Sequence, residues 1–475
     1  MSDPGRLPEI RVSGGAGGID AQYDDLERLG RLYSETGSRL AGFAWDDKLE
    51  AADGDLLASA VLSPGTFAAA ESAILDATYG PDGLAARAAL IEVQSFAFGA
   101  VVELYRTADD VQRALWEALC YRVGFVVGLS LPALTAGGGL VLGGLYLADP
   151  ELAAMTTDEL IDHLEDHPEV VETLVNGGGG LLDGMTAGPL TGPLMTALGL
   201  DGFHPDTGSA AGDLGELLFG DYHGDLNDDY PDDAFDLPPP HGVQDLMDNL
   251  AGSKQGPGVI AVQQVVGSDG ETRWVVSLPG TDDFTDEHSI RNMGSNLNLV
   301  EGDDTAYGEA IAQAMAAAGV GPDDPVMLVG HSQGGMQAAG LAADPDFGYH
   351  VTHVVTAGSP IATAGIPDHV SVLSLENTGG VVPLLDGDRN PGSANHTTVH
   401  ADVHSGSFGA GPGQNHSLET YASIGSAVDA SDDPSLQHAI DGMQGFFGGT
   451  VEDTQTHTYQ TQHGDQIRPP GMVLP

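Results

Sequence analysis

The sequence predicts an α/β domain with a mostly parallel sheet, preceded by a mainly helical N-terminal domain. Between residues 259 and 375, short β-branched runs alternate with helical patterns. This alternation is typical of parallel strands that helices cover on both faces. Before residue 120, apolar residues recur mostly at spacings of three and four, which is the period of an amphipathic helix. A chain of 475 residues is long enough for two or three such domains.

The charge of the chain is strongly one-sided. Fifteen basic and seventy acidic residues give a formal net charge of −55, and Lys48 and Lys254 are the only lysines. Such a surface repels nucleic acid and anionic lipid headgroups, so neither is expected as an electrostatic partner. Salt screens the self-repulsion of so many carboxylates. The composition therefore fits a protein of a salty medium and an acidic secreted or solubility-selected protein equally well.

The first 120 residues predict a helical hairpin. Helical spacing runs from residue 19 to about residue 60, breaks around Pro64, and returns from residue 84 toward residue 120. Two long helices joined by a short break indicate an αα-hairpin. Cys120 is the only cysteine, which excludes an intrachain disulfide. Its apolar neighbours predict a small buried core residue.

This layout resembles the small helical-hairpin proteins that the type VII systems of actinobacteria export. The segment Tyr105–Asp109 fits the Tyr-x-x-x-Asp/Glu export signal of that group, and so does Tyr23–Glu27. The Trp-x-Gly turn of the group is absent, because Trp45 is followed by two aspartates. The N-terminus lacks the basic and apolar regions of an ordinary secretory signal. The sequence therefore leaves a cytoplasmic location and type VII-like export both open.

Residues 121–220 are rich in glycine and apolar residues, and helices are expected there. Residues 123–148 are uncharged and long enough to span a bilayer, and a second apolar stretch covers residues 175–200. Small residues let helices pack closely in a membrane, so both stretches are candidates for membrane contact. They also suit a tightly packed helical pair in a soluble protein. The absence of basic flanks favours this second interpretation.

Residues 221–250 are acidic and contain three consecutive prolines, which predicts a solvated linker. His223 lies there among irregularly spaced aspartates, a pattern more typical of a solvated loop than of a metal site. We therefore expect no metal ion. The α/β domain is expected over residues 251–445, and residues 446–475 are predicted to form a C-terminal tail.

Within residues 251–445 the expected elements follow one another closely. Two β-branched runs on either side of a glycine-containing turn predict a β-hairpin. The remaining elements alternate between helix and strand. They are the hairpin strands Val259–Val266 and Arg273–Leu278, the helix Ala306–Ala318, the strand Val326–Val329, the helix Gly334–Ala343, and the strands His350–Thr356 and His369–Leu375.

A short motif joins the strand Val326–Val329 to the helix that follows. Its sequence is Gly-His-Ser-Gln-Gly, with the serine at position 332. A Gly-x-Ser-x-Gly sequence between a strand and a helix predicts a nucleophile elbow, in which the serine hydroxyl stands clear of the sheet on a sharp turn. Glycines flank the serine because side chains would collide with neighbouring elements. The helix N-terminus also supplies free N–H groups for an oxyanion. Ser332 is therefore the predicted nucleophile.

Residues 258 to about 425 resemble the class 3 lipase branch of the α/β-hydrolases, particularly its actinobacterial members. The resemblance rests on the elbow and on the Pro-Gly-Thr triplet that ends a strand at Thr281. In that family a Gly-Ser or Gly-Thr pair at this point carries the second oxyanion donor. The resemblance thus implies that the backbone N–H groups of Thr281 and Gln333 together hold the oxyanion.

The same resemblance implies a catalytic histidine near the end of the domain. His416 and Tyr421 match the family pattern of a histidine that opens the last helix, with an aromatic residue five positions later. His416 is therefore expected to take the proton from Ser332 and to return it to the leaving alcohol. Three nearby histidines on less helix-like sequence are alternatives: His396, His400 and His404.

The acid of the expected triad departs from the family. Relatives place an aspartate just before a Val-Pro pair that follows a late strand, whereas this chain has Gly380 there. Asp386 is the preferred substitute, because the glycine after it predicts a tight turn that aims its carboxylate at His416. Glu376, at the strand end, is the alternative acid. A triad that lacks its acid keeps some activity but loses on the order of 10⁴ in rate.

The resemblance predicts a serine hydrolase that cleaves carboxylic esters through a Ser-His-Asp triad, with a small-molecule or lipid ester as substrate and no cofactor. One alternative is a phospholipase-type effector or toxin exported by a type VII system. A second alternative is a non-catalytic binding module on a hydrolase scaffold, because a fold alone does not define a function. The segment Asp282–Gly302 is either a lid over the site or a structural loop.

Overall fold

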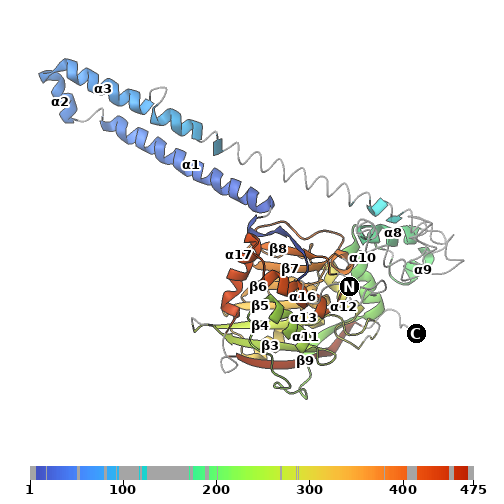
Figure 1. Ribbon diagram of the computed structural model, residues 1–475. Helices are drawn as coiled ribbons and strands as arrows, with labels where there is room; N and C mark the ends of the chain where they lie inside the picture. Colours follow the sequence, from blue (N-terminus) through green and yellow to red (C-terminus); the bar gives the residue numbers. More distant parts are fainter. Residues whose placement is uncertain are drawn as a thin grey trace. The chain divides into compact units, whose positions relative to one another are not determined.

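Figure 1 shows the computed structural model of the chain. It describes residues 7–17, 19–50, 54–79, 83–91, 175–187, 192–200, 202–267, 270–284, 288–378, 380–403, 415–448 and 454–468, with shorter pieces at 94–95, 117, 120–122, 124–125, 171 and 286. These parts fall into two compact units, Ile19–Ala114 and a larger unit made of Met1–Gly18 and Leu115–Pro475. The export-signal match Tyr105–Asp109, nearly all of residues 123–148, and His404 lie outside the described residues.

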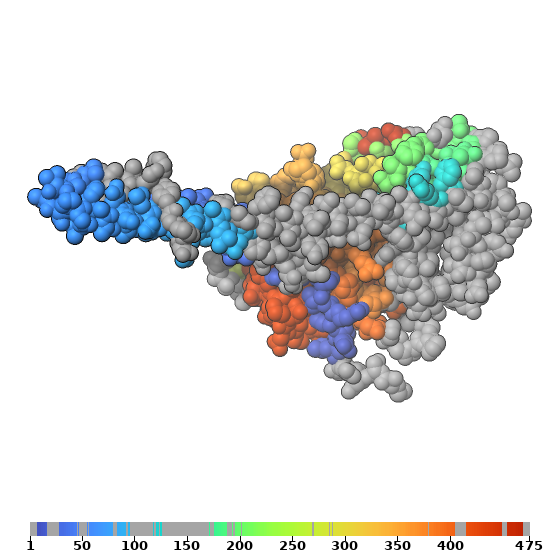
Figure 2. Space-filling view, turned by 90° about the horizontal axis from the view of Figure 1, so that it is seen from above, coloured from blue at the N-terminus to red at the C-terminus, as the bar shows by residue number. Residues whose placement is uncertain are grey.

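The smaller unit is helical where it is described. Helix α1 covers Ile19–Glu50, α2 covers Gly54–Leu62 and α3 covers Pro64–Tyr79, and residues 84–91 are again helical. In Figure 1, α1 and α3 run side by side, and Figure 2 shows their blue surface as one elongated body. Pro64 suits the start of α3. An N–H group in the first helical turn has no partner within the helix, and proline has no N–H.

The larger unit is built on one nine-stranded sheet. Its strand order is β1-β8-β7-β6-β5-β4-β3-β9-β2. Strands β4 to β8 run parallel to one another, whereas the remaining neighbouring pairs are antiparallel. The predicted α/β class is thus present as a mixed sheet with flanking helices. The strands are β1 (Ile10–Gly14), β2 (Asp221–Leu226), β3 (Val259–Val266), β4 (Thr272–Leu278), β5 (Val326–His331), β6 (Val351–Ala357), β7 (Ser371–Asn377), β8 (His396–Ala401) and β9 (Thr454–Arg468).

The elements predicted between residues 259 and 375 are present with small shifts. β3 and β4 form the expected hairpin, in which Val266 pairs with Thr272 next to the turn. Helix α13 spans Ala306–Ala318 as predicted, and α14 spans Gln333–Ala343. Their strong periodicity and short connections made these elements readable from local sequence.

The edges of the sheet correct the predicted boundaries. Residues 221–250, predicted as a linker, contain β2 and most of the helix α11 (Val243–Ser253). Residues 446–475, predicted as a tail, contain β9, which lies between β3 and β2. Near the N-terminus, β1 pairs with β8. The predicted hairpin domain, the linker and the tail therefore each contribute a strand to the same sheet.

The buried side chains of β9 explain why its sequence did not predict a strand. Several of them are threonines, which are polar but β-branched and therefore suit a strand. The hydroxyl of Thr458 donates to the carbonyl of Pro231 at 2.8 Å and accepts from the N–H of Ala234 at 3.0 Å. These bonds hold the acidic segment around residues 231–234 against the sheet, so it does not form a free linker.

Helices cover both faces of the sheet. Helices α13 and α14 pack on one face, and α11, α16 (Leu418–Asp429) and α17 (Pro434–Met443) pack on the other (Figure 1). The burial of apolar side chains between the helices and the sheet stabilises this arrangement. The first face buries Ile260, Val276, Tyr307, Ile311 and Leu328, and the second buries Leu246, Met247, Val329, Tyr421 and Ile424.

A further group of helices contains the described part of the glycine-rich region. Helices α8 (Gly178–Ala187), α9 (Gly192–Ala197) and α10 (Thr207–Phe219) share a small core, and α10 packs against α12 (Met293–Glu301). His204 links α8 to α10, because its two ring nitrogens lie 2.7 Å from Asp183 Oδ1 and 2.9 Å from Asp213 Oδ2. Over the part of the chain that is described, no helix combines the length and apolar character needed to cross a membrane.

Candidate active site

Ser332 lies at the carboxyl end of β5, where the chain turns into α14. It has φ 54° and ψ −123°, and it is the only non-glycine residue with positive φ among the described residues. Such a backbone conformation costs on the order of 1–3 kcal/mol, so the surrounding structure must hold it. The turn presents Ser332 at the edge of the sheet where the parallel strands end. This is the geometry of a nucleophile elbow.

Three glycines make this turn sterically possible. A Cβ on Gly330 would collide with the carbonyl of Gly334, and one on Gly334 would collide with the carbonyl of Leu278 on β4. A Cβ on Gly335 would collide with the hydroxyl of Ser359. The glycines therefore let the first turn of α14 approach the neighbouring backbone closely.

The loop after β4 carries the predicted oxyanion donors beside the elbow. A Cβ placed on Gly280 would lie 2.9 Å from the Cβ of Ser332, so this loop is in contact with the predicted nucleophile. The hydroxyl of Thr281 accepts a hydrogen bond from Asn296 Nδ2 at 3.1 Å. The backbone N–H groups of Thr281 and Gln333 donate to no described residue. Within the described part of the chain, both N–H groups therefore remain available to bind an oxyanion.

A buried ion pair fixes the loop that carries Thr281. Arg291 Nη2 lies 2.7 Å from Asp282 Oδ1, and Arg291 Nε donates to Asp282 Oδ2 at 2.8 Å. Arg291 is fully buried and also donates to the carbonyl of Val259 on β3 at 3.1 Å. The pair closes the first part of the segment Asp282–Gly302, and α12 forms most of the rest. Asp282 and Arg291 are thus held against β3.

His416 lies beside the elbow, directly before the N-cap residue of α16. Its carbonyl accepts a hydrogen bond from His331 Nε2 at 2.9 Å, and the two imidazole rings lie 4.5 Å apart between centroids. A Cβ on Gly358 would lie 2.8 Å from His416 Cε1. The residue before it, Ala357, accepts a hydrogen bond from the N–H of Ser332 at 3.0 Å. The structure therefore brings His416 and Ser332 to the same edge of the sheet.

The two ring nitrogens of His416 have different surroundings. Nδ1 lies 3.4 Å from the hydroxyl of Tyr421, whereas Nε2 is buried and has no hydrogen-bond partner among the described residues. Burial, and then the positive charge of Lys254, lowers the pKa of His416 to about 4. Burial and the neighbouring His416 lower the pKa of His331 to about 3. Both imidazoles are therefore neutral at pH 7, which is the state a general base requires.

The two predicted acids bind other groups. Asp386 Oδ2 accepts a hydrogen bond from the N–H of Ala362 at 2.6 Å, and burial raises the pKa of Asp386 to about 7. Glu376 Oε2 lies 3.1 Å from His400 Nδ1. Among the described residues, no carboxylate forms a hydrogen bond with His416. The structure thus brings the predicted nucleophile, base and oxyanion donors together, but it joins neither acid to the base.

Gly380 occupies the position at which the related family has an aspartate. A Cβ at this residue would lie 3.3 Å from the carbonyl oxygen of Asn377 and 4.0 Å from that of Asn415, the residue before His416. A side chain could therefore be built here without a severe collision. The glycine thus supplies no carboxylate at this position near the backbone of Asn415.

The alternative histidines on β8 have partners in the sheet. His396 is buried, and its Nε2 lies 2.8 Å from the hydroxyl of Ser374. Burial lowers the pKa of His396 to about 4. His400 Nε2 lies 3.0 Å from the hydroxyl of Ser13 on β1. Both histidines therefore belong to the hydrogen bonding of β8, a strand that its polar sequence did not predict.

Two residues at the site were given no functional role from the sequence. Tyr421 entered only as an aromatic residue that matches a family pattern, and Arg291 did not enter at all. The signal for Arg291 is its isolation, because it is the only basic residue in the acidic segment Asp282–Gly302. A single arginine in such a segment indicates a structural ion pair more than a binding surface.

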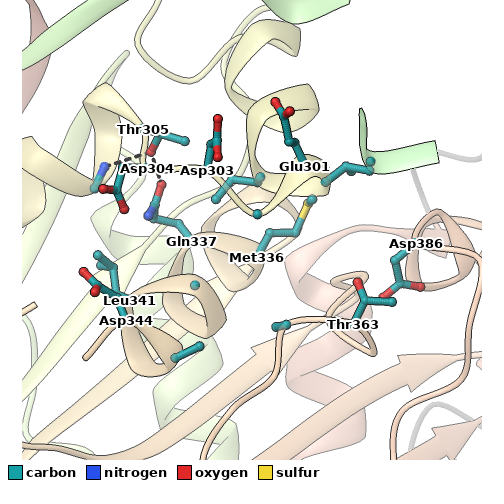
Figure 3. A pocket seen from close by; sticks show the side chains of 18 of the residues that line it. Glu301, Asp303, Asp304, Thr305, Met336, Gln337, Leu341, Asp344, Thr363 and Asp386 are labelled. Atoms are coloured by element: carbon teal, nitrogen blue, oxygen red, sulfur yellow. Dashed lines mark hydrogen bonds between the residues drawn. The ribbon is translucent and has the colours of Figure 1, made fainter. Parts of the chain in front are cut away.

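A cavity of about 840 Å³ is lined by residues of α14, of the end of α12 and of the segment that follows α12 (Figure 3). Met336, on α14 four residues after Ser332, lines it, and so do Thr363 and Asp386. Neither Ser332 nor His416 lines this cavity. Many of the other lining side chains are carboxylates, including Glu301, Asp303, Asp304 and Asp344 (Figure 3).

No group of described His, Cys, Asp and Glu side chains is arranged to hold a metal ion. Comparison with known proteins identified no relative of the chain. No family model, curated protein or solved structure matches the chain.

The low pKa of His416 predicts the pH at which an esterase built on this site would lose activity. A general base must be unprotonated, so activity should persist as the pH falls below 6 and decline only near pH 4. We expect kcat/KM for a p-nitrophenyl ester in 1 M NaCl, where charges are screened beyond about 3 Å, to show an acid limb at about pH 4. At low salt, where the charge of Lys254 is screened less, replacing Lys254 with glutamine should move that limb to higher pH. An acid limb above pH 6 would contradict the assignment.

Proposed function

We propose that the larger unit is a serine hydrolase that cleaves carboxylic esters. The observation that carries this proposal is the backbone of Ser332, which has the only positive φ of any described non-glycine residue and directly follows β5, a central strand of the sheet. Strain of this kind persists where the surrounding structure holds it in place, and it often accompanies function. The available N–H groups of Thr281 and Gln333 and the neutral His416 support the same reaction class.

The proposed reaction proceeds through an acyl-enzyme. His416 Nε2 removes the proton from Ser332 Oγ as that oxygen attacks the ester carbonyl. The carbonyl oxygen becomes negatively charged and accepts hydrogen bonds from the N–H groups of Thr281 and Gln333. The ester C–O bond then breaks, and His416 gives its proton to the leaving alcohol. Water repeats the sequence on the acyl-enzyme and releases the carboxylic acid, so that Ser332 regains its proton.

A fluorophosphonate probe tests this proposal, because it labels activated serines. We expect the wild-type protein to be labelled at Ser332, and Ser332→Ala to abolish labelling. Ser371→Ala is a matched control, since Ser371 begins β7 at the opposite edge of the parallel strands and its loss should leave labelling unchanged. Peptide mass spectrometry locates the adduct.

An unlabelled wild-type protein would overturn the esterase proposal. It would favour the second alternative, a non-catalytic binding module on a hydrolase scaffold. That alternative rests on the observation that no described carboxylate is hydrogen-bonded to His416. Labelling at a serine other than Ser332 would indicate an enzyme whose active site lies elsewhere in the chain.

A further inference from the structure

Nδ1 of His416 lies beside a tyrosine, whereas a catalytic triad has an acid at this position. Tyr421 is completely buried, and its hydroxyl lies 3.4 Å from His416 Nδ1. We propose that Tyr421 is the positioning residue of His416, and that its hydroxyl accepts the Nδ1 hydrogen in place of a carboxylate. This inference rests on the proposed ester hydrolysis, and it names the partner that orients the base.

The hydroxyl of Tyr421 is fixed by the backbone at the ends of two strands. Burial raises the pKa of Tyr421, and the backbone N–H of Asn377, the last residue of β7, lowers it in part because it is directed at the hydroxyl. After β6, Gly358 has φ +60°, and any Cβ there would collide with the Tyr421 hydroxyl. The His416 ring stands at 90° to the tyrosine ring, with 6.0 Å between centroids. The hydroxyl is therefore held by residues on both sides.

The charged alternatives are occupied elsewhere. Glu376 Oε1 accepts a hydrogen bond from Asn390 Nδ2 at 2.6 Å, and its other oxygen faces His400. Asp386 is bound to the N–H of Ala362. Tyr421 is thus the one side chain within hydrogen-bond reach of His416 Nδ1 among the described residues.

The bond to Tyr421 would select the ring tautomer that catalysis needs. A neutral imidazole carries one hydrogen, on Nδ1 or on Nε2. If Nδ1 donates to the Tyr421 oxygen, Nε2 is left with a free lone pair, and Nε2 is the buried nitrogen that has no described partner. A carboxylate would select the same tautomer and would also stabilise the imidazolium that forms during the reaction. A neutral hydroxyl supplies the orientation without that charge.

The first test reads the tautomer directly in the wild-type protein. With ¹⁵N-labelled histidine, we expect the His416 signals at pH 7 to show a hydrogen on Nδ1 and none on Nε2, with the assignment made from the spectrum of His416→Ala. A neutral His416 that carries its hydrogen on Nε2 would overturn the inference. This measurement needs no turnover, so its outcome is independent of whether the chain hydrolyses esters.

The second test removes the hydroxyl. We expect Tyr421→Phe to lower kcat for a p-nitrophenyl ester about 10-fold with KM unchanged, since orientation of the base matters only in the chemical step. The matched control is Tyr349→Phe, which removes a tyrosine hydroxyl bonded to the carbonyl of Ala312 at 3.1 Å outside the site. Unchanged kcat in Tyr421→Phe, together with inactivity of Ser332→Ala, would refute the role of Tyr421. Persisting activity in Ser332→Ala would instead refute the proposed function.

Discussion

Replacing His416 with alanine is expected to lower kcat for a p-nitrophenyl ester by at least about 10²-fold. In a complete Ser-His-Asp site, loss of the histidine costs about 10⁶ in kcat and loss of the acid costs about 10⁴. A site without a carboxylate partner lacks the contribution of the acid. Its histidine should then still account for the remaining factor of about 10² in kcat. His331 is the weaker base of the two, because burial lowers its pKa to about 3, below that of His416, while its Nε2 donates to the carbonyl of His416.

Initial rates at saturating ester measure this loss. The control is His438→Ala, since His438 is an exposed histidine on α17 whose removal should leave kcat unchanged. Circular dichroism establishes that each variant is folded. A folded His416→Ala variant with more than half of the wild-type kcat would contradict the assignment of His416 as the base.

Replacing Asp282 with asparagine is expected to lower the free energy of unfolding by about 3–5 kcal/mol. The change leaves the buried Arg291 guanidinium without a countercharge, although its hydrogen bonds to the carbonyls of Val259 and Gly256 remain. Urea unfolding followed by tryptophan fluorescence measures the effect, because Trp274 on β4 is buried in the folded unit. Thr281 precedes Asp282, so ester hydrolysis should weaken as well.

Two variants make this prediction specific. Glu271→Gln removes the partner of Arg273 from a pair in which the glutamate side chain is 68% exposed, and such exposed pairs contribute only about 0–1 kcal/mol. The double variant Asp282→Leu with Arg291→Met should be more stable than Asp282→Asn alone, since it removes the buried charges together. An Asp282→Asn variant as stable as Glu271→Gln would show that the buried pair does not hold the loop.

The parts of the fold that could be predicted are those specified by neighbouring residues. The β3–β4 hairpin follows from two β-branched runs around a short turn, and the elbow follows from glycines spaced about one serine. The edge strands could not be predicted in this way. Strand β9 buries threonine hydroxyls instead of aliphatic side chains, and its partners are residues about two hundred positions earlier in the chain. Its polar sequence is explained only by those distant partners.

The predicted acid illustrates the same limit within the site. The tight turn after Asp386 is present, and Gly387 has the positive φ of 78° that such a turn favours. The direction of the carboxylate was not determined by that turn, since it is set by the N–H of Ala362, which follows a different strand. Turn chemistry is local, whereas the choice between His416 and a backbone donor depends on how loops from separate strands pack. Tyr421 was missed for the same reason.

The pairing of the first and last strands also bears on how the protein assembles during synthesis. Strand β1 is synthesised long before its partner β8, and β3 is synthesised long before its neighbour β9. Until β9 is made, β3 has an open edge, and an open edge is a template for pairing with other chains. Contacts between such distant segments also slow folding. A nascent chain that has completed the elbow at Gly334 therefore still lacks β8 and β9, so the elbow sequence precedes the closed sheet that holds it.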